Sequence, residues 1–143
     1  MRRLAATLAV LAMTSPALAE GVTSYPFDGS FEDATFAVEN AIIERGLVID
    51  YVSHVGEMLA RTGADVDSDV ELFKAADVFL FCSAVTSRSV MEADPMNIAF
   101  CPYGIFVADQ GDKVLVGYRN YPEGAMQEVQ ILLDDIATEA VGK

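Results

Sequence analysis

Two cysteines and one histidine are the residues of this sequence best suited to covalent or metal chemistry. Cys82 and Cys101 are the only cysteines, and His54 is the only histidine. Thiolates and imidazole bind soft and borderline metals, and a pair of thiols can also form or exchange a disulfide. The two cysteines are therefore the first candidates for a functional site.

The pattern around the cysteines predicts that they lie on neighbouring strands. Val78–Val85 is almost continuously apolar, Ser87–Ala93 is a short helix before Pro95, and Asn97–Ala108 is the next strand. If these strands are antiparallel neighbours, a register symmetric about their connection places Cys82 opposite Cys101, on the same face of the sheet. Three interpretations stay open: a structural or redox disulfide, a pair of metal ligands, or two small buried side chains.

A metal site at the cysteines would need further ligands. Cys82, Cys101 and His54, with Met91 or Met96 as a thioether ligand, would suit copper or haem iron. A single histidine excludes a three-histidine zinc site within one chain. The lone histidine also has an ordinary interpretation, a hydrogen-bonded structural group.

Several familiar catalytic motifs do not fit. Cys101-Pro-Tyr-Gly resembles the start of a glutaredoxin-like site, but a strand follows it and the second cysteine of that motif is missing. The acidic stretch Asp65–Asp69 lacks the glycine and the late glutamate of a calcium loop. The sequence has no Gly-x-Ser-x-Gly elbow, phosphate-binding glycine loop or dinucleotide fingerprint. Hydrolase and kinase functions are therefore disfavoured.

The remaining elements predict the fold that positions these residues. Ser30–Arg45 and Glu123–Val141 each carry an apolar stripe at helical spacing, and Ser30 with Asp33 forms a capping pair. Leu47–Val55 is a strand, and a turn at Gln110–Asp112 joins the last two strands. We expect an α+β fold, with a single mostly antiparallel sheet and the two main helices on one face.

The first residues predict export. Arg2 and Arg3 are positively charged, Leu4–Met13 is apolar, and Ala17-Leu18-Ala19 offers small residues before a cleavage point. We expect residues 1–19 to be a cleaved signal peptide and residues 20–143 to form a single soluble domain in the periplasm.

The mature domain is strongly acidic. Of 9 basic residues two lie in the signal, which leaves seven against 22 acidic ones and a formal net charge of −15. This charge repels phosphate backbones and anionic lipids, so we expect neither nucleic acid nor a membrane as a partner. The strand Val78–Val85 is apolar on both faces, which predicts that it is interior and that a second subunit covers its other face in a homodimer.

Three segments resemble the domain of unknown function 302 family. They are Phe79-Leu-Phe-Cys-Ser-Ala, then Val90-Met-Glu-Ala-Asp-Pro, and Ile98-Ala-Phe-Cys-Pro-Tyr-Gly-Ile-Phe-Val. The resemblance implies a fold similar to half of the TATA-binding protein, in the order β-α-β4-α, often paired as dimers. It supplies no established activity.

These observations lead to three hypotheses for the function. The first is a periplasmic accessory domain that binds a small ligand, a metal or haem at the Cys82 and Cys101 region, or that serves another periplasmic protein. The second is a thiol-disulfide or sulfur-handling redox protein that uses the same cysteines. The third is a structural dimer module with an inert disulfide. Reduction potential separates the last two, because a structural disulfide resists reduction.

Overall fold

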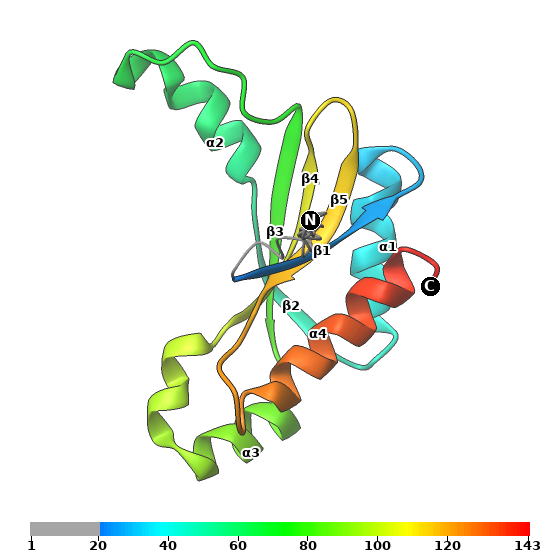
Figure 1. The fold of residues 1–143 in the computed structure, drawn as a ribbon, viewed down its shortest axis with the longest axis vertical. Coiled ribbons are helices and arrows are strands. Elements are labelled where there is room, and N and C mark those ends of the chain that lie inside the picture. Colours follow the sequence, from blue (N-terminus) through cyan, green and yellow to red (C-terminus); the bar gives the residue numbers. More distant parts are fainter. Residues whose placement is uncertain (1–20) are drawn as a thin grey trace, which may run out of the picture.

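The computed structural model describes residues 21–143 and has an α+β fold, as the sequence predicts (Figure 1). The predicted signal peptide at residues 1–19 lies outside the described residues. The strands are β1 (Val22–Phe27), β2 (Val48–Ser53), β3 (Ala75–Cys82), β4 (Tyr103–Asp109) and β5 (Val114–Arg119). The helices are α1 (Phe31–Ile43), α2 (Val55–Thr62), α3 (Ala84–Ala93) and α4 (Gln127–Ala140), with 3-10 turns η1 (Gly63–Val66) and η2 (Pro95–Phe100).

The five strands form one antiparallel sheet in the order β1-β5-β4-β3-β2. Leaving out the short α2 and α3, the chain follows the expected order β-α-β4-α. β3 lies between β2 and β4, so the prediction that this apolar strand is interior is confirmed. The two edges are irregular: β1 contains Pro26, and the register of β2 shifts between Ile49 and Tyr51, where Asp50 is the extra residue.

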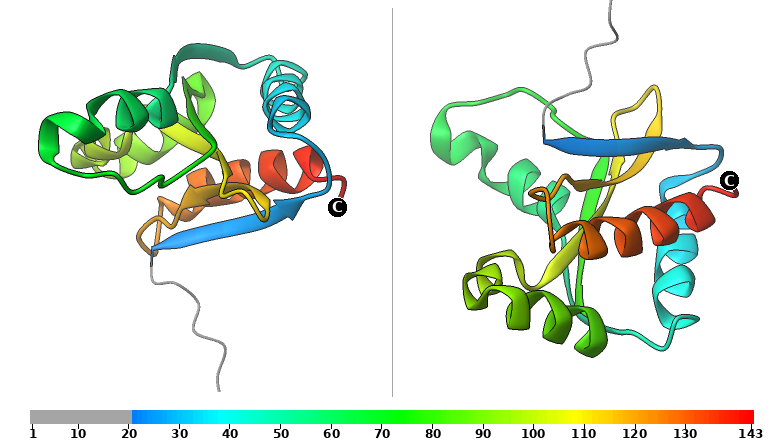
Figure 2. Two further views of the ribbon diagram at one scale, coloured as in Figure 1. Left: turned by 90° about the horizontal axis from the view of Figure 1, so that it is seen from above. Right: turned by 60° about the horizontal axis from the view of Figure 1, so that its bottom comes forward.

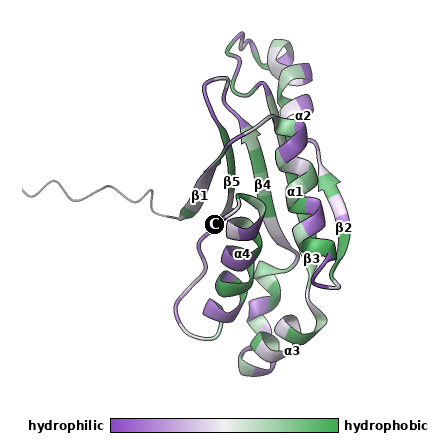
Figure 3. Ribbon diagram, turned by 90° about the vertical axis from the view of Figure 1, so that its right-hand side faces the viewer, coloured by the Kyte–Doolittle hydropathy of each residue, from purple (hydrophilic) through white to green (hydrophobic). Residues whose placement is uncertain are grey.

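The helices α1 and α4 cover one face of the sheet, as predicted (Figures 2 and 3). They contact each other, and both contact β4 and β5. The core between helices and sheet is apolar, because alternate strand residues such as Phe79, Phe81, Ile105 and Val116 point toward the helices and are almost fully buried. The helices α2 and α3 lie at opposite ends of the sheet (Figure 1).

The limits of the main helices follow local signals. The Ser30 hydroxyl accepts a hydrogen bond from the Asp33 N–H, and the Asp33 carboxylate accepts one from the Ser30 N–H, so the predicted capping box is present. The last helix begins at Gln127 rather than at the predicted Glu123. The reason is Gly124, whose φ of 91° is incompatible with a right-handed helix.

Two predicted limits around the cysteines are wrong. β3 ends at Cys82 rather than at Val85, because the Ser83 side chain accepts a hydrogen bond from the Thr86 N–H and caps α3 there. Residues 97–102 are not part of a strand. Asp94 caps η2 by accepting a hydrogen bond from the Met96 N–H, and β4 begins only at Tyr103.

No helix within residues 21–143 combines the length and the apolar composition that crossing a membrane requires.

Candidate functional site

Cys82 and Cys101 lie at the same end of the β3–β4 strand pair. Cys82 is the last residue of β3, and Cys101 is the C-cap of η2, two residues before β4. The ladder pairs Phe81 with Tyr103, one residue out of the predicted register, so Cys82 does not face Cys101 across it. Because Cys101 leaves the 3-10 turn before the strand begins, η2 rather than the ladder sets its position.

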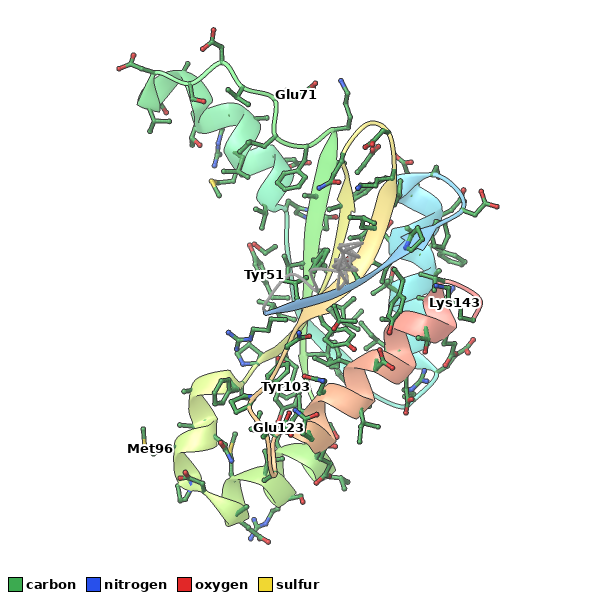
Figure 4. All side chains as sticks on the ribbon, in the orientation of Figure 1. Tyr51, Glu71, Met96, Tyr103, Glu123 and Lys143 are labelled. Carbon is green, nitrogen blue, oxygen red and sulfur yellow. The ribbon has the colours of Figure 1, made fainter. Side chains whose placement is uncertain are left out.

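Hydrogen bonds fix the elements that carry the two cysteines. The Cys101 N–H donates to the Ile98 carbonyl at the end of η2, and the Cys101–Pro102 peptide bond is cis. The hydroxyl groups of Ser87 and Tyr103 are 2.9 Å apart, which ties α3 to the first residue of β4. Tyr103 is fully buried, and its ring packs edge-on against that of Tyr121 (Figure 4). The two thiols are therefore held at the junction of β3, α3, η2 and β4.

The Cys101 side chain lies close enough to Cys82 to affect its ionisation. Both thiols are free and half-buried. The pKa of the Cys82 thiol is raised to about 12, first by burial, then by its hydrogen bond to the Cys101 side chain and by the negative charges of Cys101 and Asp50. A hydrogen bond from the Tyr103 backbone opposes this rise in the pKa of Cys82 only in part. At neutral pH, Cys82 therefore keeps its proton.

Cys101 lines a groove of about 450 Å³ on the face of the sheet opposite α1 and α4. The groove is lined by residues of β3, β4 and β5 and of the segment before β4: Val78, Leu80, Cys101, Pro102, Gly104, Phe106 and Arg119. Gly104 keeps its floor open, because a Cβ there would lie 3.3 Å from Leu80 Cδ2 and 3.4 Å from Val78 Cγ1. The volume lies within the range of small-ligand pockets.

Arg119 is the charged residue of the groove. It is the last residue of β5, and its guanidinium carbon lies 5.7 Å from the centre of the Phe100 ring and 5.4 Å from that of the Tyr121 ring. These distances are typical of cation–π contacts. Within residues 21–143, no carboxylate forms an ion pair with Arg119.

His54 lies far from the cysteines. Its Nδ1 is 2.8 Å from an Asp77 carboxylate oxygen, and this hydrogen bond raises the pKa of the exposed imidazole. Asp77 and Cys82 are five residues apart on β3, which at about 3.3 Å per residue separates them by roughly 16 Å. The residue opposite Cys82 on β2 is Val48.

The two candidate methionines lie on α3 and η2, the elements that connect Cys82 to Cys101. Met91, on α3, packs against the core, and Met96 is 70% exposed at the outer side of η2 (Figure 4). Within the described part of the chain, no three histidine, cysteine, aspartate or glutamate side chains are grouped to hold a metal ion. Of the candidates Cys82, Cys101, His54, Met91 and Met96, the structure brings the two cysteines together.

A second cluster of titratable groups lies on the covered face. The hydroxyls of Tyr25 and Tyr118 donate to the same Asp134 oxygen, at 2.5 Å and 2.6 Å. The pKa of Tyr25 is raised chiefly by this hydrogen bond, and that of Tyr118 chiefly by burial. The cluster joins β1 and β5 to α4. All of its hydroxyl groups are paired, so we interpret it as structural.

No sequence pattern associates Arg119 with the cysteines. The signal available in the sequence is weak: an arginine at the end of an apolar strand, next to Tyr118 and two residues before Tyr121, in a chain with few basic residues. Its position beside Cys101 depends on the sheet order, which places β5 next to β4.

Comparison with known proteins identifies the family. The family model described as "Domain of unknown function DUF302" matches residues 23–142. A crystal structure of an uncharacterized conserved protein DUF302 from Bacillus stearothermophilus is similar, with a TM-score of 0.60 and 13% identity over 83% of this chain and 91% of that chain. At this identity the likeness shows the fold alone. No curated protein matches the chain. Because the family model spans most of its length, the chain belongs to the DUF302 family, whose function is unknown.

Proposed function

We propose that this DUF302 domain is an exported accessory protein that exchanges disulfides through Cys101 and Cys82 with a ligand in the groove. The observation that carries the proposal is the placement of two thiols side by side at one end of a groove, with Cys101 among the lining residues. The lining residues do not include Cys82. The two thiols therefore differ in their access to a ligand.

This difference assigns a role to each thiol. The Cys101 thiolate attacks one sulfur of a ligand disulfide, forms a mixed disulfide and releases one ligand thiolate. Cys82 then gives up its proton and attacks the Cys101 sulfur, which forms the internal disulfide and releases the second ligand thiolate. The protein loses two electrons and two protons, and the ligand disulfide becomes two thiols. Access to the groove supports this order, because Cys101 lines the groove and Cys82 does not.

Export supports a redox function for the pair. The predicted signal at residues 1–19 would deliver the domain to the periplasm, where disulfides form and persist. A half-buried thiol pair in that compartment meets oxidants that cytosolic thiols do not.

A second candidate function is the binding of a soft metal ion by the same thiols. It is favoured by their proximity at the end of β3, because Cu(I) prefers thiolate ligands. With His54 elsewhere, the described residues offer two thiolates and no third cysteine, histidine, aspartate or glutamate at that point. Haem would need an axial ligand set that this pair does not resemble.

The two functions respond differently to single substitutions. If one thiol is the nucleophile and the other resolves the mixed disulfide, Cys101→Ser and Cys82→Ser should react with a disulfide at different rates. If the two thiolates together bind a metal ion, both substitutions should lower the metal affinity equally. The chain has only two cysteines, so each thiol that a disulfide reagent releases can be assigned to the reaction of Cys82 or Cys101.

The test is the reaction of the reduced protein with 4,4′-dithiodipyridine, followed by absorbance and intact mass. We expect the wild type to release two thiols per chain and to end two hydrogen masses lighter. Cys82→Ser should release one thiol and keep one pyridyl adduct, and Cys101→Ser should react far more slowly. A wild-type product with two adducts, or equal rates for the two variants, would contradict the exchange mechanism. Equal loss of Cu(I) binding in both variants, measured without oxygen, would favour the metal site.

A further inference from the structure

Arg119 and Cys101 line the same groove, one residue with a charge and the other with a reactive sulfur. They come from β5 and from the segment before β4. One ligand in the groove can therefore reach both residues, which makes Arg119 a candidate for ligand selection.

The charge of Arg119 is available to a ligand. Arg45 forms an ion pair with Glu139, and Arg88 forms one with Glu92 at 2.7 Å. Arg61 lies exposed at the end of α2. Arg119 alone among the arginines of residues 21–143 is placed against aromatic rings. The rings of Phe100 and Tyr121 restrict the guanidinium without neutralising its charge.

The walls of the groove add a requirement for an apolar body. Val78, Leu80, Pro102 and Phe106 present carbon surface, and Arg119 is the only charged lining residue. A guanidinium offers paired N–H donors that match the two oxygens of a carboxylate or sulfonate.

We propose that the groove selects small disulfides that have an apolar body and a carboxylate or sulfonate group, which Arg119 binds while Cys101 attacks the sulfur. This selection rests on the proposed exchange function. It runs against the overall charge, because a domain with 22 acidic residues repels anions at long range. Selection for an anion must therefore come from a local contact, and losing that contact should reverse the preference.

The experiment compares two aromatic disulfides that differ in charge. The anionic reagent is 5,5′-dithiobis(2-nitrobenzoate), and the neutral reagent is 4,4′-dithiodipyridine. Second-order rates of the first thiol release are measured for the reduced wild type, Arg119→Gln, Arg119→Lys and Arg61→Gln. Each rate is divided by that of the denatured chain, which removes the intrinsic reactivity of the reagent. Arg61→Gln is the matched control, because it removes the same charge away from the groove.

We expect Arg119→Gln to slow the anionic reagent about 10-fold, the effect of roughly one charge-assisted contact. The neutral reagent should change less than about twofold under the same substitution. The rate of Arg119→Lys with the anionic reagent should lie between those of the wild type and Arg119→Gln, since lysine keeps the charge but lacks the paired N–H donors of the guanidinium. Arg61→Gln should change neither rate.

Three results would overturn the selection: no effect of Arg119→Gln, equal slowing of both reagents, or equal slowing of the anionic reagent by Arg61→Gln. Circular dichroism of each variant checks that the fold is intact. The proposed exchange function fails in a different way, because Cys101 would then react slowly with both reagents in the wild type. If the wild type reacts normally with the neutral reagent and neither rate depends on Arg119, the proposed selection is wrong and the proposed exchange function stands.

Discussion

The two faces of the sheet differ in whether their polar groups have partners. On the face covered by α1 and α4, the hydroxyls of Tyr25 and Tyr118 both donate to Asp134, and the hydroxyl of Tyr103 is paired with that of Ser87. On the open face, the thiol of Cys101 is free and no carboxylate pairs with the charge of Arg119 within the described residues.

This difference separates stability from reactivity. A buried polar group left without a partner costs about 1–3 kcal/mol. Within residues 21–143, the Tyr121 hydroxyl is the one buried side-chain group without a hydrogen-bond partner. A group at a groove can stay available, since water solvates it until a ligand arrives. The covered face should therefore determine the free energy of unfolding, and the open face should determine the chemistry.

The strongest test of this comparison uses a phenylalanine on each face. Phe81 is fully buried under the helices, whereas Phe106 is half-buried and lies over Gly117. Phe81→Ala should lower the free energy of unfolding by about 3–5 kcal/mol, because it leaves a cavity in a packed core. Phe106→Ala should cost about 1 kcal/mol, because its ring is already partly in water. Denaturant unfolding measures both, and equal losses would show that the open face is as tightly packed as the covered one.

A smaller effect is expected for the polar cluster of the covered face. Asp134→Ala leaves the hydroxyls of Tyr25 and Tyr118 without their acceptor and should cost about 2–3 kcal/mol. Asp135→Ala is the matched control, since this neighbour is exposed and should change stability by less than about 0.5 kcal/mol. Thiol reactivity of Asp134→Ala should remain that of the wild type at a denaturant concentration where the domain is folded. A loss of reactivity in the folded variant would show that the two faces are coupled.

The smallest effect is a dependence of stability on pH at the thiol pair. The pKa of Cys82 rises from 9.0 to about 12 on folding, so the folded state holds this proton more tightly. The resulting stabilisation is fully present below about pH 9 and is lost as the pH rises toward 12. The slope should stay well below the limit of about 1.4 kcal/mol per pH unit, because Cys82 is only half-buried.

Comparison with Cys82→Ala isolates this contribution. The tyrosines also have raised pKa values and titrate at higher pH, so the difference between wild type and variant is the quantity to follow near pH 9 to 10. We expect the stability curves of the two proteins to converge as the pH rises. Parallel curves would mean that Cys82 ionises in the folded protein as it does in the unfolded chain.

The parts of the fold that could be predicted depend on short sequence signals. The capping box of Ser30 and Asp33 and the hairpin turn at Gly111, with its φ of 92°, each involve a few adjacent residues. The segment 95–100 is harder to predict from the sequence, because its apolar residues are typical of a strand. Asp94 followed by Pro95 is nevertheless a helix-start pattern, a capping carboxylate before a proline at the first helical position.

The candidate site could be predicted only where one short connection joins its parts. Cys82 and Cys101 are brought together by α3 and η2, so their proximity follows from local folding even though the register is shifted by one residue. Arg119 reaches the site through the pairing of β5 with β4, and His54 is kept away by the β2–β3 register. Sheet order and register depend on the whole chain, and no short pattern encodes them.

The irregular edges of the sheet affect how the folded protein meets other chains. An exposed, regular edge strand is a template on which another strand can add, which leads to aggregation. Pro26 removes one N–H donor from the β1 edge, and the extra residue at Asp50 bends the β2 edge and adds a charge to it. Neither edge offers an uninterrupted ladder to an incoming strand, so the sheet ends at five strands.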